Sequence, residues 1–101
     1  KIYKKYTITN VRYEKDYYSS DNEFSVKLFV SGKKTYDANG SNYSSSVPVG
    51  WKLYDSNGSV VETGTVYSPD IAVGESFTDA YGYISTDLKP GYYNLVFIDT
   101  I

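Results

Sequence analysis

Side-chain shape is the feature that most constrains the fold of this chain. Valine, isoleucine, threonine, tyrosine, phenylalanine and tryptophan supply 42 of the 101 residues, whereas alanine, leucine, glutamate, glutamine and methionine supply 11. Branched and aromatic side chains lose rotamer freedom in a helix and fit the pleated surface of a sheet. The composition therefore predicts a domain that is nearly all β.

Hydrophobic alternation predicts where the strands lie. Phe24, Val26, Leu28 and Val30 alternate with polar residues such as Ser25 and Lys27, which is typical of a strand with one buried face. The strands are expected at 2–13 (with a break at Asn10 that suggests a bulge), 24–30, 49–54, 59–67, 71–77, near 81–84 and at 93–98. About seven short strands with regular turn signals predict an antiparallel β-sandwich in a single domain over 1–101.

Three further details follow from the same pattern. Trp51 shares an apolar face with Val49 and Leu53, which predicts that it anchors the core. The segment 55–58, Asp-Ser-Asn-Gly, predicts a hairpin turn because Asn and Gly tolerate positive φ. The segment 93–98 is apolar on both faces, which predicts a central strand.

The order of the strands also predicts which loops meet. Successive antiparallel strands send their connections alternately to the two ends of a sandwich. One end is expected to hold the loop 32–46, the connection 68–70 and the turn 88–91; the other is expected to hold 17–22, 55–58 and a turn at 79–80.

The residue types present argue against catalysis. The chain contains no histidine, cysteine or methionine, which excludes disulfides, zinc sites built from Cys or His, thiol nucleophiles and a Ser-His-Asp triad. Its carboxylates are scattered and mostly lie beside turn residues, as solvated surface groups do. The sequence therefore predicts no enzyme activity and no cofactor.

Charge and chain composition bear on partners and location. A net charge of −2 provides no field that would attract nucleic acid. No apolar run is long enough for a membrane span or a signal peptide, so this segment is not expected to insert into a membrane. The chain opens in strand-like sequence without Met and lacks cysteine, which favours a module excised from a larger bacterial envelope or secreted protein, located outside the cell or in its envelope.

Two short motifs resemble known families of bacterial surface domains. Trp51-Lys52-Leu53-Tyr54-Asp55 resembles the signature of the FxLYD family of immunoglobulin-like domains, with Trp in place of the leading Phe. Leu88-x-Pro90-Gly91-x-Tyr93-x-Leu95 is similar to the closing strand of prealbumin-like and CnaB-type repeats. The resemblance implies that the predicted sandwich is immunoglobulin-like or prealbumin-like. It also implies a non-catalytic module that serves as a stalk segment or interaction domain. Tyr93, just after the Pro-Gly turn, is expected to return its hydroxyl to loop backbone, as in a tyrosine corner.

The long loop is the candidate binding region. Residues 32–46 are polar and rich in Ser, Gly and Asn, and loops of this length in small domains are often functional. The candidate binding residues are Lys33, Lys34, Tyr36, Tyr43 and, beside the loop, Tyr67. They combine aromatic area, charge and adaptable hydrogen-bond donors. The expected function is structural spacing or protein interaction; binding of carbohydrate by exposed loop tyrosines is the alternative, and the partner would be a protein or glycan at the cell surface.

The same loop raises the question of a cation. Asp37, Asn39 and Asn42 place oxygen donors at intervals that resemble a calcium loop. The segment lacks a terminal bidentate Glu and carries little carboxylate charge. An ordinary Asx-rich loop is the favoured interpretation, and no metal is assigned.

Overall fold

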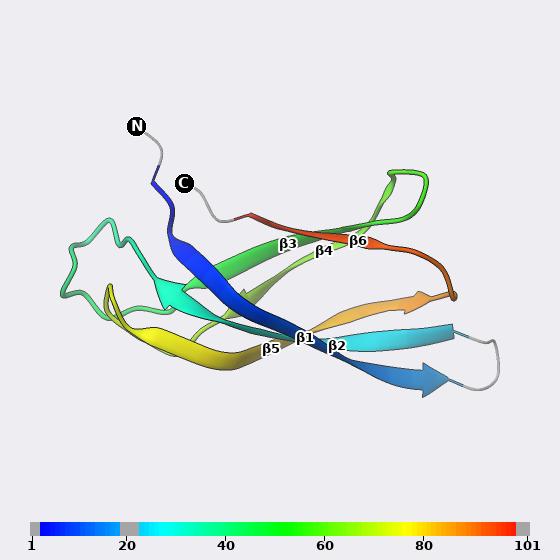
Figure 1. Cartoon of the computed structure of the whole chain (residues 1–101), viewed down its shortest axis with the longest axis horizontal. Coiled ribbons are helices and arrows are strands. Elements are labelled where there is room, and N and C mark those ends of the chain that lie inside the picture. The colour runs from blue at the N-terminus through cyan, green and yellow to red at the C-terminus, as the bar shows by residue number, and fades with distance from the viewer. Residues whose placement is uncertain (1–2, 19–22, 99–101) are drawn as a thin grey trace.

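The computed structural model describes residues 3–18 and 23–98, and within these every regular element is a β-strand (Figure 1). The strands are β1 (Tyr6–Tyr18), β2 (Glu23–Lys34), β3 (Pro48–Tyr54), β4 (Val60–Tyr67), β5 (Ser76–Leu88) and β6 (Asn94–Ile98). The all-β prediction is confirmed, with six strands among the described residues instead of about seven.

The strands form two three-stranded sheets in a sandwich-like arrangement. The sheet orders are β1-β2-β5 and β4-β3-β6, and every strand pairing is antiparallel. On one side the edge strands β4 and β5 pack against each other. The molecule is elongated, with extents of 49 × 25 × 17 Å and a radius of gyration of 15.2 Å, above the ~13 Å typical of a compact chain of this length.

The core lies between the two sheets and is built by the alternation seen in the sequence. Leu28 and Val30 of β2 face Val49, Trp51 and Leu53 of β3, and these residues belong to one cluster. Trp51 is 3% exposed, which confirms its predicted burial. The cluster also contains Tyr6, Val47, Val66, Phe77, Ala80, Ile84 and Leu88.

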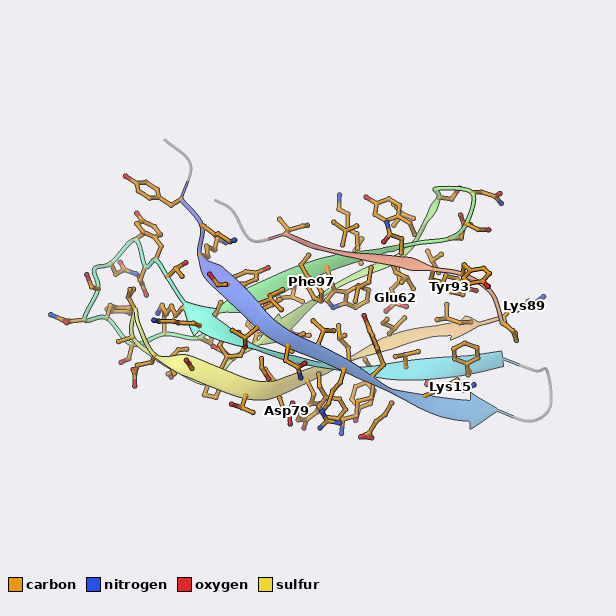
Figure 2. The ribbon with its side chains drawn as sticks, in the orientation of Figure 1. Lys15, Glu62, Asp79, Lys89, Tyr93 and Phe97 are labelled. Carbon is orange, nitrogen blue, oxygen red and sulfur yellow. The ribbon has the colours of Figure 1, made fainter. Side chains whose placement is uncertain are left out.

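Two local predictions are confirmed in detail. The 55–58 turn closes the β3-β4 hairpin: the Gly58 amide donates to the Asp55 carbonyl at 3.0 Å, and Gly58 has a φ of 83°. The Tyr93 hydroxyl donates to the Lys89 carbonyl at 2.7 Å, so the predicted return bond to the loop backbone is present (Figure 2).

The first strand is longer than predicted. Its pairing with β2 shifts register between Ile8 and Asn10, which confirms the expected irregularity. The strand then continues to Tyr18, although 17–22 reads as a polar loop. Pairing with the long β2 extends it, because a cross-strand ladder can override weak local propensity.

The prediction of separate strands at 71–77 and near 81–84 is wrong, because one continuous strand, β5, spans 76–88. The expected turn at 79–80 is a bulge: register against β2 shifts between Val30 and Gly32, and Asp79 adopts a φ of 53°. The Asp79 amide donates to the Ser31 hydroxyl at 2.9 Å, which holds the bulge in place. Because 76–88 is one strand, the turn after Leu88 lies at the end of the molecule opposite the long loop (Figure 1). The prediction that this turn lies at the same end as the loop 32–46 is therefore wrong.

The prediction that the last strand is central is also wrong. β6 pairs with β3 and lies at the edge of its sheet. Its outward side chains Val96 and Ile98 are 40% and 47% exposed. Alternation reports how apolar each face is, and it does not report whether a neighbouring strand is present.

Candidate functional site

The base of the long loop is closed by a buried lysine. Lys34 ends β2, and its side chain is only 3% exposed. Its ammonium donates to Asp37 Oδ2 at 2.8 Å, to the Ile71 carbonyl at 2.7 Å and to Ser45 Oγ at 3.0 Å. A buried ammonium is tolerated when its hydrogens are satisfied and a counter-ion is present. Lys34 therefore ties the loop to the 71–75 segment.

Asp37 completes this closure. Besides the Lys34 ammonium, its carboxylate accepts the Asn39 amide at 2.8 Å and the Ser45 hydroxyl at 2.8 Å. These contacts, led by the hydrogen bond from Lys34, lower the pKa of Asp37 from 3.8 to about 2. The Asp37 carboxylate, which a calcium loop would need as a ligand, thus already binds the Lys34 ammonium and accepts the Asn39 amide in an Asx turn. Among the described residues no group of three or more acidic, histidine or cysteine side chains is placed to hold a metal.

The predicted binding residues lie at the long-loop end of the molecule, but they differ in exposure and therefore in what they can do. Lys33 is exposed, Lys34 is buried, and Tyr43 and Tyr67 are more than half exposed. Tyr36 is partly buried and stacks on Tyr3, with ring centroids 4.3 Å apart and an interplanar angle of 6°. Lys34 is thus a structural cation of the loop, whereas Lys33, Tyr43 and Tyr67 are available to a partner.

A second candidate surface lies on the outer face of the β1-β2-β5 sheet. Register aligns Arg12 with Phe29, Phe29 with Tyr81, and Lys27 with Tyr83. Tyr81 and Tyr83 are 58% and 52% exposed, whereas Phe29 is buried at 8%. We call Arg12, Lys27, Phe29, Tyr81 and Tyr83 the aromatic patch.

Cations and rings are interleaved in the aromatic patch. The Lys27 ammonium lies 4.4 Å from the Tyr81 ring centroid, 5.0 Å from that of Phe29 and 5.7 Å from that of Tyr83. The Arg12 guanidinium lies 3.8 Å from the Phe29 centroid. Tyr81 meets Tyr83 edge-on at 84° and is tilted by 48° to Phe29. Cation–π and edge-to-face contacts of this kind fix the side chains without covering them.

The edge of the aromatic patch is set by an ion pair. Arg12 donates to both carboxylate oxygens of Asp79 at 3.2–3.3 Å, and Glu14 lies 3.8 Å away. Asp79 stands on β5 at the bulge (Figure 2). The hydrogen bond to Asp79, more than any other contact, raises the pKa of Arg12. The ion pair with Asp79 therefore helps to hold the guanidinium over the Phe29 ring.

Sequence reasoning missed the aromatic patch, although one signal was present. Phe29 falls on the polar face of the 24–30 alternation, between Lys27 and Ser31. Phe29 is a large aromatic residue on a solvent-facing side of its strand. Tyr81 and Tyr83 are two positions apart and therefore share one face of another strand. Together they indicate a cluster of aromatic residues on the surface. The missing information was the β2-β5 register, which joins residues more than fifty positions apart.

Comparison with protein-family models, with curated proteins and with solved structures finds no match to this chain. No helix in the described residues is long and apolar enough to cross a membrane.

Proposed function

We propose that this chain is a non-catalytic, immunoglobulin-like module of a bacterial cell-surface or secreted protein, and that it binds another protein through the aromatic patch. The observation that carries the proposal is the patch itself: two half-exposed tyrosines, an arginine and a lysine arranged around Phe29 on an open sheet face. Tyr and Arg are among the residue types that are enriched at the centres of protein interfaces.

Ring geometry favours a protein over a sugar as the ligand. A pyranose ring stacks on a freely exposed aromatic face, and several sugars need several coplanar faces. Tyr81 and Tyr83 stand at 84° to each other, and the Lys27 ammonium lies close to both rings. Interleaved rings and cations suit side chains of mixed chemistry, which a protein surface provides.

The immunoglobulin-like assignment has two supports. The sheet orders β1-β2-β5 and β4-β3-β6 match those of an immunoglobulin-like domain from which edge strands are missing. The Tyr93 hydroxyl donates to the Lys89 carbonyl just before β6, as in a tyrosine corner. The 49 Å length suits a spacer in a larger surface protein. The absence of cysteine agrees with a bacterial origin.

The proposal is tested by site-specific photo-crosslinking. A photoreactive amino acid replaces Tyr81 in one variant and Tyr67, an equally exposed tyrosine at the long-loop end, in the matched control. Incubated with proteins from the source cell surface, the Tyr81 variant should crosslink a discrete protein and the Tyr67 variant should not. Crosslinking through Tyr67 alone would show that the protein binds at the long-loop end and not at the aromatic patch. Selective binding to a glycan array that depends on Tyr43 or Tyr67 would favour the carbohydrate alternative.

A further inference from the structure

A hollow lies where the turn of the β3-β4 hairpin meets the segment that leads into β6. Both segments stand at the end of the molecule opposite the long loop (Figure 1). The hollow has a volume of about 540 Å³, within the range of roughly 300–1,000 Å³ that small-molecule sites occupy. We call it the hairpin hollow. Its lining includes Tyr54, Asp55, Ser56, Tyr92, Tyr93 and Asn94.

Two tyrosine rings of the hairpin hollow present open surface. Tyr92 is 90% exposed, and Tyr54, at the end of β3, is partly buried. Among the described residues, neither ring contacts another ring or a cation. Tyr81 and Tyr83 of the aromatic patch differ, because the Lys27 ammonium lies close to both of their rings. The hairpin hollow therefore offers uncovered aromatic surface to a ligand.

Hydrogen-bonding side chains accompany these rings. Asp55 Oδ1 accepts the backbone amides of Asn57 at 2.9 Å and Ser59 at 3.0 Å, which orients the carboxylate. The other carboxylate oxygen, Oδ2, makes no hydrogen bond within the described part of the chain. The same holds for the side chains of Ser56 and Asn94. Acceptors and donors thus stand beside the rings without partners in the described residues.

The backbone around the hairpin hollow is held on both sides. On one side, the 55–58 turn is closed by the hydrogen bond from the Gly58 amide to the Asp55 carbonyl. On the other side, the Tyr93 hydroxyl donates to the Lys89 carbonyl at 2.7 Å. A ligand therefore meets a largely formed site, which lowers the entropic cost of binding.

We propose that the hairpin hollow binds a neutral saccharide. One face of a pyranose ring is made of carbon-bound hydrogens and packs on the rings of Tyr54 and Tyr92. Each sugar hydroxyl both donates and accepts, so it suits the Asp55 carboxylate and the Asn94 amide together. No lysine or arginine of the described residues lines the hollow. An acidic sugar would thus meet the Asp55 charge without a counter-ion, which favours a neutral one.

A proline-rich segment is the other class of ligand that grooves lined by aromatic residues accept. Proline has no N–H, so such a segment provides carbonyl acceptors and few donors. The Asp55 carboxylate, which only accepts, would lose water there without gaining a donor. A saccharide satisfies both the rings and the polar side chains. The hairpin hollow is separate from the aromatic patch, which lies on the outer face of the other sheet.

An NMR titration that follows each backbone amide tests the proposal. The probes are cello-, chito- and manno-oligosaccharides, which are neutral and differ in their hydroxyl patterns. At about 10 mM, enough to saturate a site with a Kd of about 1 mM, at least one of them should shift the Ser56, Tyr92 and Asn94 amides saturably. The amides of the loop 36–45 should not move. Absence of a saturable shift with all three probes would overturn the proposal.

Matched variants connect the response to the rings. Tyr92→Ala should weaken binding about fivefold or more because a stacking face is lost, whereas Tyr92→Phe, which keeps the ring, should retain most of it. Tyr67→Ala, at an exposed tyrosine of the opposite end, is the control and should bind like the parent chain. Tyr81→Ala should also bind like the parent chain, so this result is independent of the proposed function. Undiminished binding by Tyr92→Ala would overturn the proposal, and a response to an oligoproline peptide but to no sugar would overturn it in favour of a peptide ligand.

Discussion

The indole of Trp51 lies directly against Gly64 on the neighbouring strand. The two residues are register partners of β3 and β4, and a Cβ built on Gly64 would lie 2.4 Å from Trp51 Cζ2 and 2.7 Å from Cε2. The absence of a side chain at Gly64 therefore provides the space in which the largest core side chain lies. Tryptophan and glycine form a complementary cross-strand pair.

Gly64→Ala should destabilise the fold. Overpacking at this contact is expected to cost about 1–3 kcal/mol, because the ring is enclosed in the core. Gly50→Ala on β3 is the matched control, since a Cβ there would lie at an ordinary 3.7 Å from Ile98. Urea unfolding followed by Trp51 fluorescence measures both. Equal stability of the Gly64 variant and the parent chain would show that the indole is not confined at this position.

Asp37→Asn should lower stability at neutral pH and lose its effect in acid. The folded-state pKa of Asp37 is about 2, below its ordinary value of 3.8. The ionised carboxylate therefore stabilises the fold above about pH 4, and this contribution is lost as pH falls through about 2. The difference in unfolding free energy between the parent chain and Asp37→Asn should shrink over this interval. In a Lys34→Met background the pH dependence should be shallower, and an unchanged slope there would exclude Lys34 as the main cause.

Replacement of Asp79 should distinguish backbone strain from its ion pair. Asp79→Gly and Asp79→Ala both remove the partner of Arg12, but only glycine adopts the left-handed φ of 53° without a steric penalty. Asp79→Gly should therefore be more stable than Asp79→Ala by about 1 kcal/mol. Thermal unfolding of the two variants gives the comparison. Equal stability of Asp79→Ala and Asp79→Gly would show that the left-handed backbone at position 79 carries no steric penalty for a side chain.

Tyr6→Phe should loosen the contact between β1 and β6. Tyr6 is fully buried in the core, and its hydroxyl donates to the Ile98 carbonyl. Loss of this hydrogen bond is expected to cost about 0.5–1.5 kcal/mol, because the ring still fills its place. Tyr3→Phe, a more exposed tyrosine of the same segment, is the control. Denaturant unfolding should show a loss for Tyr6→Phe that exceeds the loss for Tyr3→Phe.

The local features of this protein follow from its amino-acid sequence alone. Side-chain shape gave all-β structure, alternation located β2 and β3 and buried Trp51, and turn chemistry placed the hairpin at 55–58. These features depend on residues close together in the chain, whose periodicity and φ preferences act without knowledge of the rest of the fold.

The features that join distant residues depend instead on long-range pairing and packing. Partners from outside the local segment make 76–88 one bulged strand, bury Lys34 against Asp37 and Ile71, and assemble the aromatic patch from three strands. They also leave β6 at an edge although its sequence suits the interior. The physical reason is that local pattern sets which face of a strand is apolar, whereas the neighbours that cover that face are fixed by long-range pairing and packing.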